Sequence, residues 1–352
     1  MATLVQAIRL ALHYGETHLG VTDIFGEDVG PPLGGVFTAT QGLKTAWNSP
    51  LDERGIIGTA MGIAWAGGRP VAEIQFCDYA LNTIDLMKLA GSQRWAGAGE
   101  WELPMVVMTP TGAGIRGSLY HSHCFESWAS RLSGWKIVMP STPLDAYGLM
   151  LSAIVDPNPV LMLLPKALMR VPGAERIPGE PESADQLRAM IDAPVGDRRD
   201  WQPTWPEIQP HFISLGKAAT RREGDAATVI SYGRTLPLCV QAADEIRDSH
   251  QIACEVIDLR TLFPYDWDTI RASILRTGRV LIVHEDTEVT SFGEHLLRRV
   301  VEECFYDLMV RPRLVQGRHL PGIGLNPMYE EQTLPQLSGI RQAMLELARE
   351  AA

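Results

Sequence analysis

Two carboxylates, Asp52 and Glu53, stand at the start of a helical run of small residues, PLDERGIIGTAMGIA. Acidic side chains in a first helical turn complement the helix dipole, so simple capping is one interpretation. The glycines and alanines that follow also allow a neighbouring helix to pack closely, and a carboxyl at such a subunit contact would be desolvated. Glu53 is therefore a candidate proton carrier with a raised pKa, and the residues leave both interpretations open.

A second group of candidates lies at the end of the apolar run VAEIQFCDY, where Gln75 and Tyr79 follow the buried positions. Ligands of parallel α/β sheets bind beyond the carboxyl ends of the strands, so polar and aromatic residues there are candidates for ligand binding. The alternative is an aromatic side chain that packs beneath the next helix. The pattern supports both interpretations equally.

The glycine-rich stretch TPTGAGIRGSLYHSH carries His121 and His123. Glycine lets a backbone approach a ligand closely, and histidine moves protons near neutral pH. A metal site is disfavoured because no carboxylate or third histidine lies nearby at ligand spacing, so we expect acid–base or hydrogen-bonding chemistry. A further polar group, His284, Glu285 and Asp286, is expected to be an exposed strand end.

The elements that must position these residues alternate between strands and helices. Residues 1–172 contain short strand-like runs that are apolar throughout, which favours a parallel sheet covered on both faces. Residues 173–215 are rich in proline and predict an extended linker with little regular structure. Residues 216–352 show three further strand–helix units, so we predict an α/β protein with a second, smaller parallel-sheet domain.

Composition excludes several classes of protein. The 352 residues carry 31 basic and 42 acidic side chains, a net charge of −11, which argues against binding to nucleic acid or an anionic membrane surface. No apolar run approaches the ~18 residues that a membrane span requires. The five cysteines form no CxxC pair, and the amino terminus lacks a signal-peptide pattern, so we expect a cytoplasmic protein without disulfides or zinc.

Several motifs occur together in a fixed order: FGEDVG, PLDERGIIGTAMGIA, AEIQFCDY, the glycine-rich stretch to LYHS, PSTPLDAYGLMLSAI, DPNP and VIDLRTLFPYD. In this combination the chain resembles the β subunit of the thiamine-diphosphate-dependent 2-oxo acid dehydrogenases, the family of the pyruvate and branched-chain enzymes. The resemblance covers most of the chain. It implies a pyrimidine-binding, transketolase-like domain followed by a transketolase carboxyl-terminal-like domain.

The resemblance implies roles for individual residues around the cofactor's aminopyrimidine ring. Glu53 matches the glutamate that hydrogen-bonds a ring nitrogen, the contact that activates the cofactor by proton transfer. Leu51 matches the residue whose backbone approaches the amino group, and Tyr79 the aromatic residue that packs on the ring. Gln75 is a polar neighbour of the ring, and Glu27 a supporting acid.

Two further roles follow from the same resemblance. His121 matches an active-site histidine that serves transfer of the acyl group to a lipoyl group. The family often binds a monovalent cation, here K⁺, through backbone carbonyls at positions that match Ala153, Asp156 and Asn158.

The family's Gly-Asp-Gly motif, which anchors the diphosphate and a divalent metal in related thiamine enzymes, does not occur in this sequence. Phosphate-bound Mg²⁺ requires oxygen ligands, so a separate α subunit must supply them. The resemblance therefore implies a heterotetramer of two α and two β subunits that acts on a 2-oxo acid and passes the acyl group to a lipoyl-bearing acyltransferase. The long proline-rich linker favours a branched-chain substrate, with pyruvate next.

The sequence also departs from the family pattern. Where the family reads HSQSPE, this chain reads HSHCFE at 121–126; Met108 stands where an arginine is common; and a segment beginning at His319 replaces an Asp-Thr-Pro motif. These differences leave the substrate and the partner open.

Two alternatives follow from these departures: another thiamine enzyme of this type, such as an acetoin-cleaving dehydrogenase, or a non-catalytic scaffolding subunit. The scaffolding alternative is disfavoured because a subunit without chemistry would not be expected to keep Glu53, Gln75, Tyr79 and His121 together.

Overall fold

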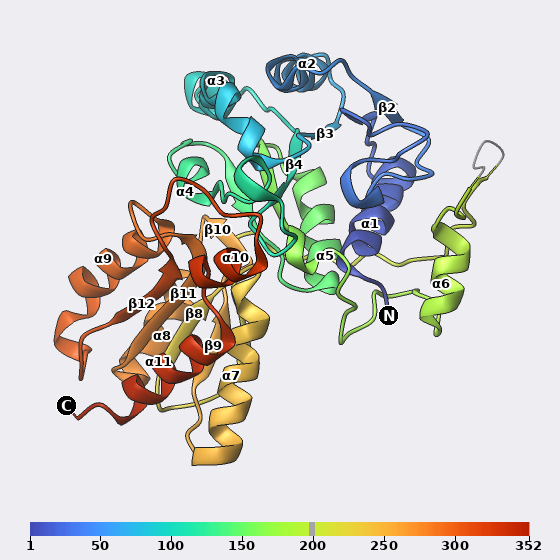
Figure 1. The fold of residues 1–352 in the computed structure, drawn as a ribbon. Coiled ribbons are helices and arrows are strands. Elements are labelled where there is room, and N and C mark those ends of the chain that lie inside the picture. The colour runs from blue at the N-terminus through green and yellow to red at the C-terminus, as the bar shows by residue number, and fades with distance from the viewer. Residues whose placement is uncertain (197–200, 352) are drawn as a thin grey trace. The chain divides into compact units, whose positions relative to one another are not determined.

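The computed structural model describes residues 1–196 and 201–351 (Figure 1). These residues form two compact units. The amino-terminal unit comprises Met1–Thr111 and Arg131–Leu215, and the carboxyl-terminal unit comprises Gly112–Ser130 and the chain from Gly216 onward. Each unit is described separately.

A parallel sheet forms the centre of the amino-terminal unit. Its strands lie in the order β5-β6-β4-β3-β1-β2, and every pair among them is parallel. The strands are β1 (Asp23–Gly26), β2 (Ala46–Asn48), β3 (Pro70–Glu73), β4 (Val106–Thr111), β5 (Lys136–Val138) and β6 (Val160–Pro165). The helices of this unit are α1 (Leu4–His18), α2 (Glu53–Trp65), α3 (Ile84–Ala96), α5 (Pro143–Val155) and α6 (Ala184–Ile191).

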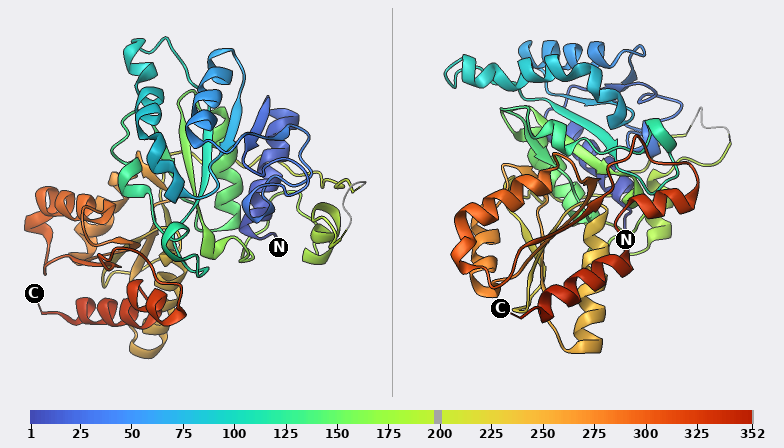
Figure 2. Two further views of the ribbon diagram at one scale, coloured as in Figure 1. Left: turned by 45° about the horizontal axis from the view of Figure 1, so that its top comes forward. Right: turned by 60° about the vertical axis from the view of Figure 1, so that its left-hand side comes forward.

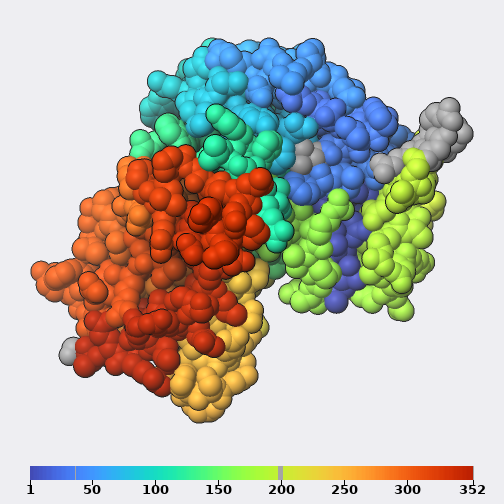
Figure 3. Space-filling model, viewed as in Figure 1, coloured from blue at the N-terminus to red at the C-terminus, as the bar shows by residue number. Residues whose placement is uncertain are grey.

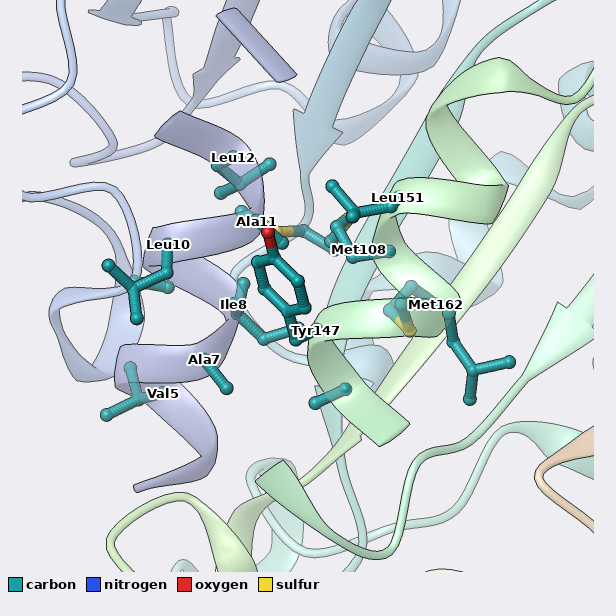
Figure 4. Close-up of a cluster of buried hydrophobic side chains, with 14 of the residues drawn as sticks. Val5, Ala7, Ile8, Leu10, Ala11, Leu12, Met108, Tyr147, Leu151 and Met162 are labelled. Atoms are coloured by element: carbon teal, nitrogen blue, oxygen red, sulfur yellow. The ribbon is translucent and has the colours of Figure 1, made fainter. Parts of the chain in front are cut away.

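Helices α1 and α5 pack together over the central strands. Thr3 begins α1 with a capping box, in which its side chain accepts from the Gln6 backbone while the Gln6 side chain accepts from the Thr3 backbone. Figure 4 shows Tyr147 of α5 against Ile8 and Ala11 of α1, and all three side chains are fully buried. Strands β4 and β6 are buried along their whole length, as expected for a parallel sheet covered on both faces.

The described parts of the proline-rich stretch, residues 173–196 and 201–215, pack on the amino-terminal unit and contain α6, where we expected an extended linker without regular structure. Leu187 and Ile191 lie one helical turn apart and are fully buried in this unit's core. The fully buried Arg9 pairs with Asp192 at 2.7 Å, and the Tyr147 hydroxyl donates to Gln209 O at 2.9 Å. The prolines lie outside α6, so they do not interrupt its hydrogen bonds.

The carboxyl-terminal unit is built on a second sheet in the order β12-β11-β8-β9-β7. Its pairs are parallel except that β7 runs antiparallel to β9, so the predicted parallel sheet has one antiparallel edge strand. Figure 2 shows α7 (gold) beside α11 (red), and these helices share one apolar core. The elements are β7 (Ala219–Arg222), β8 (Thr228–Ser231), β9 (Glu255–Asp258), β10 (Thr261–Phe263), β11 (Val280–Thr287), β12 (Arg313–Gly317), α4 (Glu126–Ala129), α7 (Thr235–His250), α8 (Trp267–Thr277), α9 (Phe292–Cys304), α10 (Pro327–Thr333) and α11 (Leu337–Arg349).

The segment Gly112–Ser130 groups with the carboxyl-terminal unit, although it directly follows strand β4 in sequence. The compact units therefore differ from simple cuts of the chain, and the domain boundaries 1–172, 173–215 and 216–352 stay predictions. Across the described residues, none of the helices combines the length and apolar character needed to cross a membrane. All five cysteines are free thiols.

Candidate active site

Strands β1 and β3 bring the first candidates to one edge of the amino-terminal sheet. They are parallel neighbours, and their last residues, Gly26 and Glu73, are paired. Glu27 and Gln75 therefore leave the sheet at the same carboxyl edge, where ligands of parallel sheets bind. The Gln75 side-chain amide donates to Asp28 Oδ2 at 3.4 Å, which joins the segments that follow the two strands.

Glu53 is the first residue of α2, and its side chain is held from outside that helix. It is half-buried, and Asn82 Nδ2 donates to its Oε2 at 3.2 Å. The next residue, Arg54, donates to Asn82 O at 3.0 Å and to Asp85 Oδ2 at 2.9 Å. Asp52, at the N-cap position of α2, makes no side-chain cap bond. The hydrogen bonds of Glu53 and Arg54 therefore do not arise from the helix capping that the sequence suggested.

Glu27 lies close enough to Glu53 for the two carboxyls to influence each other. Burial, followed by the charges of Glu53 and Asp28, raises the pKa of Glu27 above the usual carboxyl value. Its Oε1 is buried without a hydrogen-bond partner among the described residues. A buried acceptor without a partner is costly, so this atom is suited to a group that carries a donor.

Tyr79 lies beside the same acidic group, on the 3-10 helix Cys77–Thr83 that follows β3. Burial and then the charges of Asp78, Glu27 and Glu53 raise the pKa of Tyr79, so its hydroxyl stays protonated near the two glutamates. Phe76 meets its ring edge-on at 6.0 Å between centroids. The structure thus brings together Glu27, Glu53, Gln75 and Tyr79, while the Leu51 side chain, 82% exposed, points away from the protein interior before α2.

His121 lies in the other unit, on the segment Gly112–Ser130. It follows the short 3-10 helix Ser118–Tyr120, is half-buried, and its Nδ1 lies 3.2 Å from Gly117 O. A histidine with one ring nitrogen fixed by a backbone carbonyl presents the other nitrogen for proton transfer. His123 is exposed, so the two histidines differ in their surroundings.

The polar group at β11 is buried, where we expected an exposed strand end. His284 is fully buried and Asp286 is 8% exposed. Burial lowers the pKa of His284 to about 4, so the imidazole is neutral at physiological pH. The expectation was wrong because α9 and the segment Gly112–Ser130 cover this end of the strand: Gly293 lies against the His284 ring, and Ser127 hydrogen-bonds Asp286.

Comparisons with known proteins agree with this arrangement. Residues 7–172 match the transketolase pyrimidine binding domain, and residues 216–340 match the transketolase C-terminal domain. A Bacillus subtilis 2-oxoisovalerate dehydrogenase subunit beta is 34% identical over 351 residues, covering 98% of each chain. Its Pseudomonas aeruginosa counterpart is 37% identical over 328 residues, covering 91% of this chain and 88% of the relative. This chain is a member of the 2-oxo acid dehydrogenase β-subunit family.

Two further relatives are consistent with this membership. A 3-methyl-2-oxobutanoate dehydrogenase subunit beta from Mycobacterium tuberculosis is 37% identical over 313 residues, covering 87% of this chain and 81% of the relative. The solved structure of a "Split gene transketolase, inactive beta4 tetramer" has a TM-score of 0.71 at 15% identity and covers all of both chains, which supports the fold alone. The predicted family and the predicted transketolase-like fold of this β subunit are therefore confirmed.

The turn after α5 brings together the three residues of the β subunit that we associated with a monovalent cation. Asp156 N donates to Ala153 O at 3.3 Å, and Asn158 donates from both its backbone and its side chain to Asp156 Oδ1 at 2.9 Å. Lys136 pairs with the other oxygen of Asp156. No group of three or more His, Cys, Asp or Glu side chains within the described parts of the chain is arranged to hold a metal ion.

Sequence reasoning missed three residues that position Glu53 in this β subunit: Asn82, Arg54 and Asp85. Asn82 lies near the end of the 3-10 helix Cys77–Thr83, two residues before α3, where its residue type suggests an ordinary helix start. The only local signal was that Arg54 directly follows Glu53. The contact between the two segments depends on packing of α2 against the 3-10 helix, which no local pattern encodes.

Proposed function

We propose that this chain is the β subunit of a branched-chain 2-oxo acid dehydrogenase and supplies the pyrimidine half of a thiamine diphosphate site. The observation that carries the proposal is the convergence of Glu27, Glu53 and Tyr79 at the carboxyl edge of the amino-terminal sheet. The branched-chain substrate is supported by relatives named for 2-oxoisovalerate and 3-methyl-2-oxobutanoate.

The residues present fit an aminopyrimidine ring. The Glu27 Oε1 atom is buried and lacks a partner. Asn82 bonds one oxygen of the half-buried Glu53, which leaves the other oxygen for a ligand. Tyr79 offers an aromatic face beside them, with Gln75 as a polar neighbour and the Leu51 backbone at the approach to α2. When bound, thiamine diphosphate supplies the electron sink that decarboxylation of a 2-oxo acid requires.

In this proposal Glu53 holds and moves the activating proton. A carboxyl that shares its proton with a ring nitrogen would favour the imino form of the amino group across the ring, so proton transfer would depend on the orientation of Glu53 rather than on an unusually strong base. Asn82 fixes one oxygen of Glu53, which directs the other toward its partner. The raised pKa of Glu27, caused by burial and then by the charges of Glu53 and Asp28, means that this carboxyl holds a proton more readily than an ordinary glutamate.

For His121 we propose a role in acyl transfer to a lipoyl group carried by an acyltransferase. The support is its half-buried position and the contact of Nδ1 with Gly117 O, which favours a protonated Nδ1 and holds the ring in one orientation. The departure from the family pattern at His123 and Cys124 lies directly beside it.

The proposal requires an α-type partner that holds the diphosphate and its Mg²⁺, within a heterotetramer. Helix α2 is suited to contact that partner because a Cβ at Gly58 or Gly62 would meet no atom within 4 Å. Figure 3 shows the atoms of the α2 and α3 regions, in blue and cyan, at the surface of the amino-terminal unit. Trp65 at the end of α2 is 54% exposed, so an apolar side chain adjoins this open helix face.

The cation at the DPNP turn is also a proposal, in which backbone carbonyls around Ala153, Asp156 and Asn158 would bind K⁺. The Asp156 carboxylate is already engaged by Asn158 and Lys136, so the carbonyl oxygens remain as ligands. A stabilisation by KCl that equal concentrations of NaCl do not reproduce would support this site, and equal effects of both salts would reject it.

The function is tested by co-expressing this chain with its α-type partner and following decarboxylation of 3-methyl-2-oxobutanoate and pyruvate with added thiamine diphosphate and Mg²⁺. We expect turnover only when both chains are present, with the branched-chain substrate preferred. Glu53→Gln should reduce turnover by at least about a hundredfold while the complex still assembles. The neighbouring Asp52→Asn variant is the matched control, since Asp52 makes no cap bond. Near-normal turnover of Glu53→Gln would reject the proposal.

A further inference from the structure

Hydrogen bonds attach the segment Gly112–Ser130, which carries His121, to the rest of the carboxyl-terminal unit. Arg116 N donates to Glu330 Oε2 of α10 at 3.0 Å. At its other end, the Ser127 hydroxyl donates to Asp286 Oδ2 of β11 in a short hydrogen bond. Gly112 N donates to His123 O at 2.8 Å and closes the segment on itself. The position of His121 therefore depends on these attachments.

Glu126, the first residue of α4, lies at the second attachment and is 1% exposed. Neither of its carboxylate oxygens has a side-chain partner among the described residues. Its neighbour across the contact, Asp286, is also buried, and the Tyr232 hydroxyl beside them is buried without a partner. Burial away from water disfavours an ionised carboxyl, so these surroundings favour the neutral acid.

The titratable side chains beside Glu126 on other elements are negatively charged or neutral, whereas the backbone N–H groups of Glu126 and Phe125 hydrogen-bond its carboxyl and favour the charged form. Strand β11 carries Glu285 and Asp286, and Tyr232 directly follows strand β8. Arg234 pairs with Glu285 at 3.7 Å and so offsets the charge of that carboxylate. The neutral, fully buried ring of His284 stacks on Tyr232 with centroids 6.0 Å apart.

On the segment itself, His123 and Cys124 are the titratable neighbours of this buried pair. His123 is exposed and favours the charged form of Asp286, whereas Cys124 is half-buried beside Tyr232. Burial and then the charge of Asp286 raise the pKa of Glu126 well above the usual carboxyl value. Burial also raises the pKa of Asp286, although the hydrogen bond from Ser127 opposes this effect.

We propose that Glu126 and Asp286 form a proton-dependent latch that holds the segment Gly112–Ser130, and with it His121, on the carboxyl-terminal unit. Glu126 is then a positioning residue for His121, a role that rests on the proposed acyl-transfer function. The attachment itself does not rest on that function, because it can be measured without catalysis.

The sign of the effect follows from the direction of the two shifts. In the closed state of the segment Glu126 keeps its proton. In the open state it loses that proton at an ordinary carboxyl pKa near 4.5. The equilibrium constant for opening therefore rises by about tenfold per pH unit above that value and levels off beyond the raised pKa of the closed form. Stability of the attachment is fully present at low pH and is lost as pH rises through this window.

Amide hydrogen exchange of the full-length chain over a pH series, corrected for the intrinsic pH dependence of exchange, tests the latch. We expect peptides within 112–130 to lose protection as pH rises, while peptides of strand β8 keep theirs. Glu126→Gln, which mimics the neutral acid, should keep the segment protected over the whole series. Glu330→Gln is the matched control on the other attachment, and it should retain the pH dependence of the native chain.

Protection that does not change with pH in the native chain, or an unchanged pH dependence in Glu126→Gln, would overturn the latch. If Glu126→Gln fails to fold, Asp286→Asn gives the same test from the opposite side of the contact. Protection that follows added KCl or MgCl₂ instead of pH would also overturn it, because the pair would then hold a cation rather than a proton. A functional latch with an inactive complex would reject only the proposed catalytic role.

Discussion

Asn82 donates a hydrogen bond of 3.2 Å from its side-chain amide to Oε2 of Glu53, across 29 positions of sequence. The bond joins the 3-10 helix after β3 to the first residue of α2. It orients a carboxyl whose proposed activating role depends on the direction of its hydrogen bond more than on its charge. The backbone carbonyl of Asn82 is separately held by Arg54 at 3.0 Å, so the side chain can be changed without releasing the segment.

Asn82→Ala should lower kcat for decarboxylation by roughly fivefold, about the value of one hydrogen bond of ~1 kcal/mol, because Glu53 loses its orienting partner. Asn82→Asp should lower it further, since a carboxylate would then face Glu53 and disfavour its charged form. Steady-state kinetics of the assembled complex measures both effects, and thermal unfolding of each variant checks the fold. Native kcat in both variants would show that Glu53 needs no orientation from this residue.

His121→Ala should slow transfer to a lipoyl acceptor more than decarboxylation measured with an artificial electron acceptor. The reason is that a proton relay at His121 would serve the transfer half of the reaction only. His123→Ala, an exposed histidine two residues away, is the control and should change neither rate appreciably. Equal losses in the two assays for His121→Ala would reject the assignment.

Gly62→Leu should weaken binding of the α-type partner by about tenfold, because a large side chain on the open face of α2 prevents close helix packing. The variant should still fold, since a Cβ at Gly62 meets no atom within 4 Å. Gly339→Leu in α11 is the matched control, because its surroundings are equally open. Titration calorimetry with the purified partner measures the affinity, and equal affinities for both variants would exclude α2 from the interface.

The buried His284 predicts a loss of stability in acid. Its pKa is about 4 in the folded chain against an ordinary value of 6.5, so the unfolded chain gains a proton first as pH falls. The neutral His284 therefore contributes about 3 kcal/mol to the free energy of unfolding above pH 6.5, and this contribution is lost between pH 6.5 and about 4.

Urea unfolding of the native chain and of His284→Gln across this window measures that contribution. The difference between the two curves isolates His284 from Glu126 and Asp286, whose raised pKa values act in the opposite direction. His18→Gln, at the exposed end of α1, serves as the control. Parallel curves for the native chain and His284→Gln would show that this histidine is not titrated by unfolding.

The sequence by itself determined the family, the transketolase-like fold and the order of most strands and helices. These features depend on local patterns: wholly apolar strands of a parallel sheet, capping residues before helices, and ordered motifs along the chain. The same patterns placed Gln75 at a strand end and Glu53 at a helix start, whereas Glu27 was named from the resemblance alone. Because β1 and β3 are parallel neighbours, their carboxyl ends meet at one edge, where Glu27 and Gln75 both lie.

The tertiary structure alone decided which side chains support these residues and which polar groups are buried. Asn82 reaches Glu53, α6 forms within a proline-rich stretch, and the segment 112–130 joins the carboxyl-terminal unit. His284 and Asp286 looked like an exposed strand end, yet α9 and the segment that carries Glu126 cover them. Burial and hydrogen bonding between distant segments depend on the packing of whole elements. The spacing of residues within a single segment does not predict that packing.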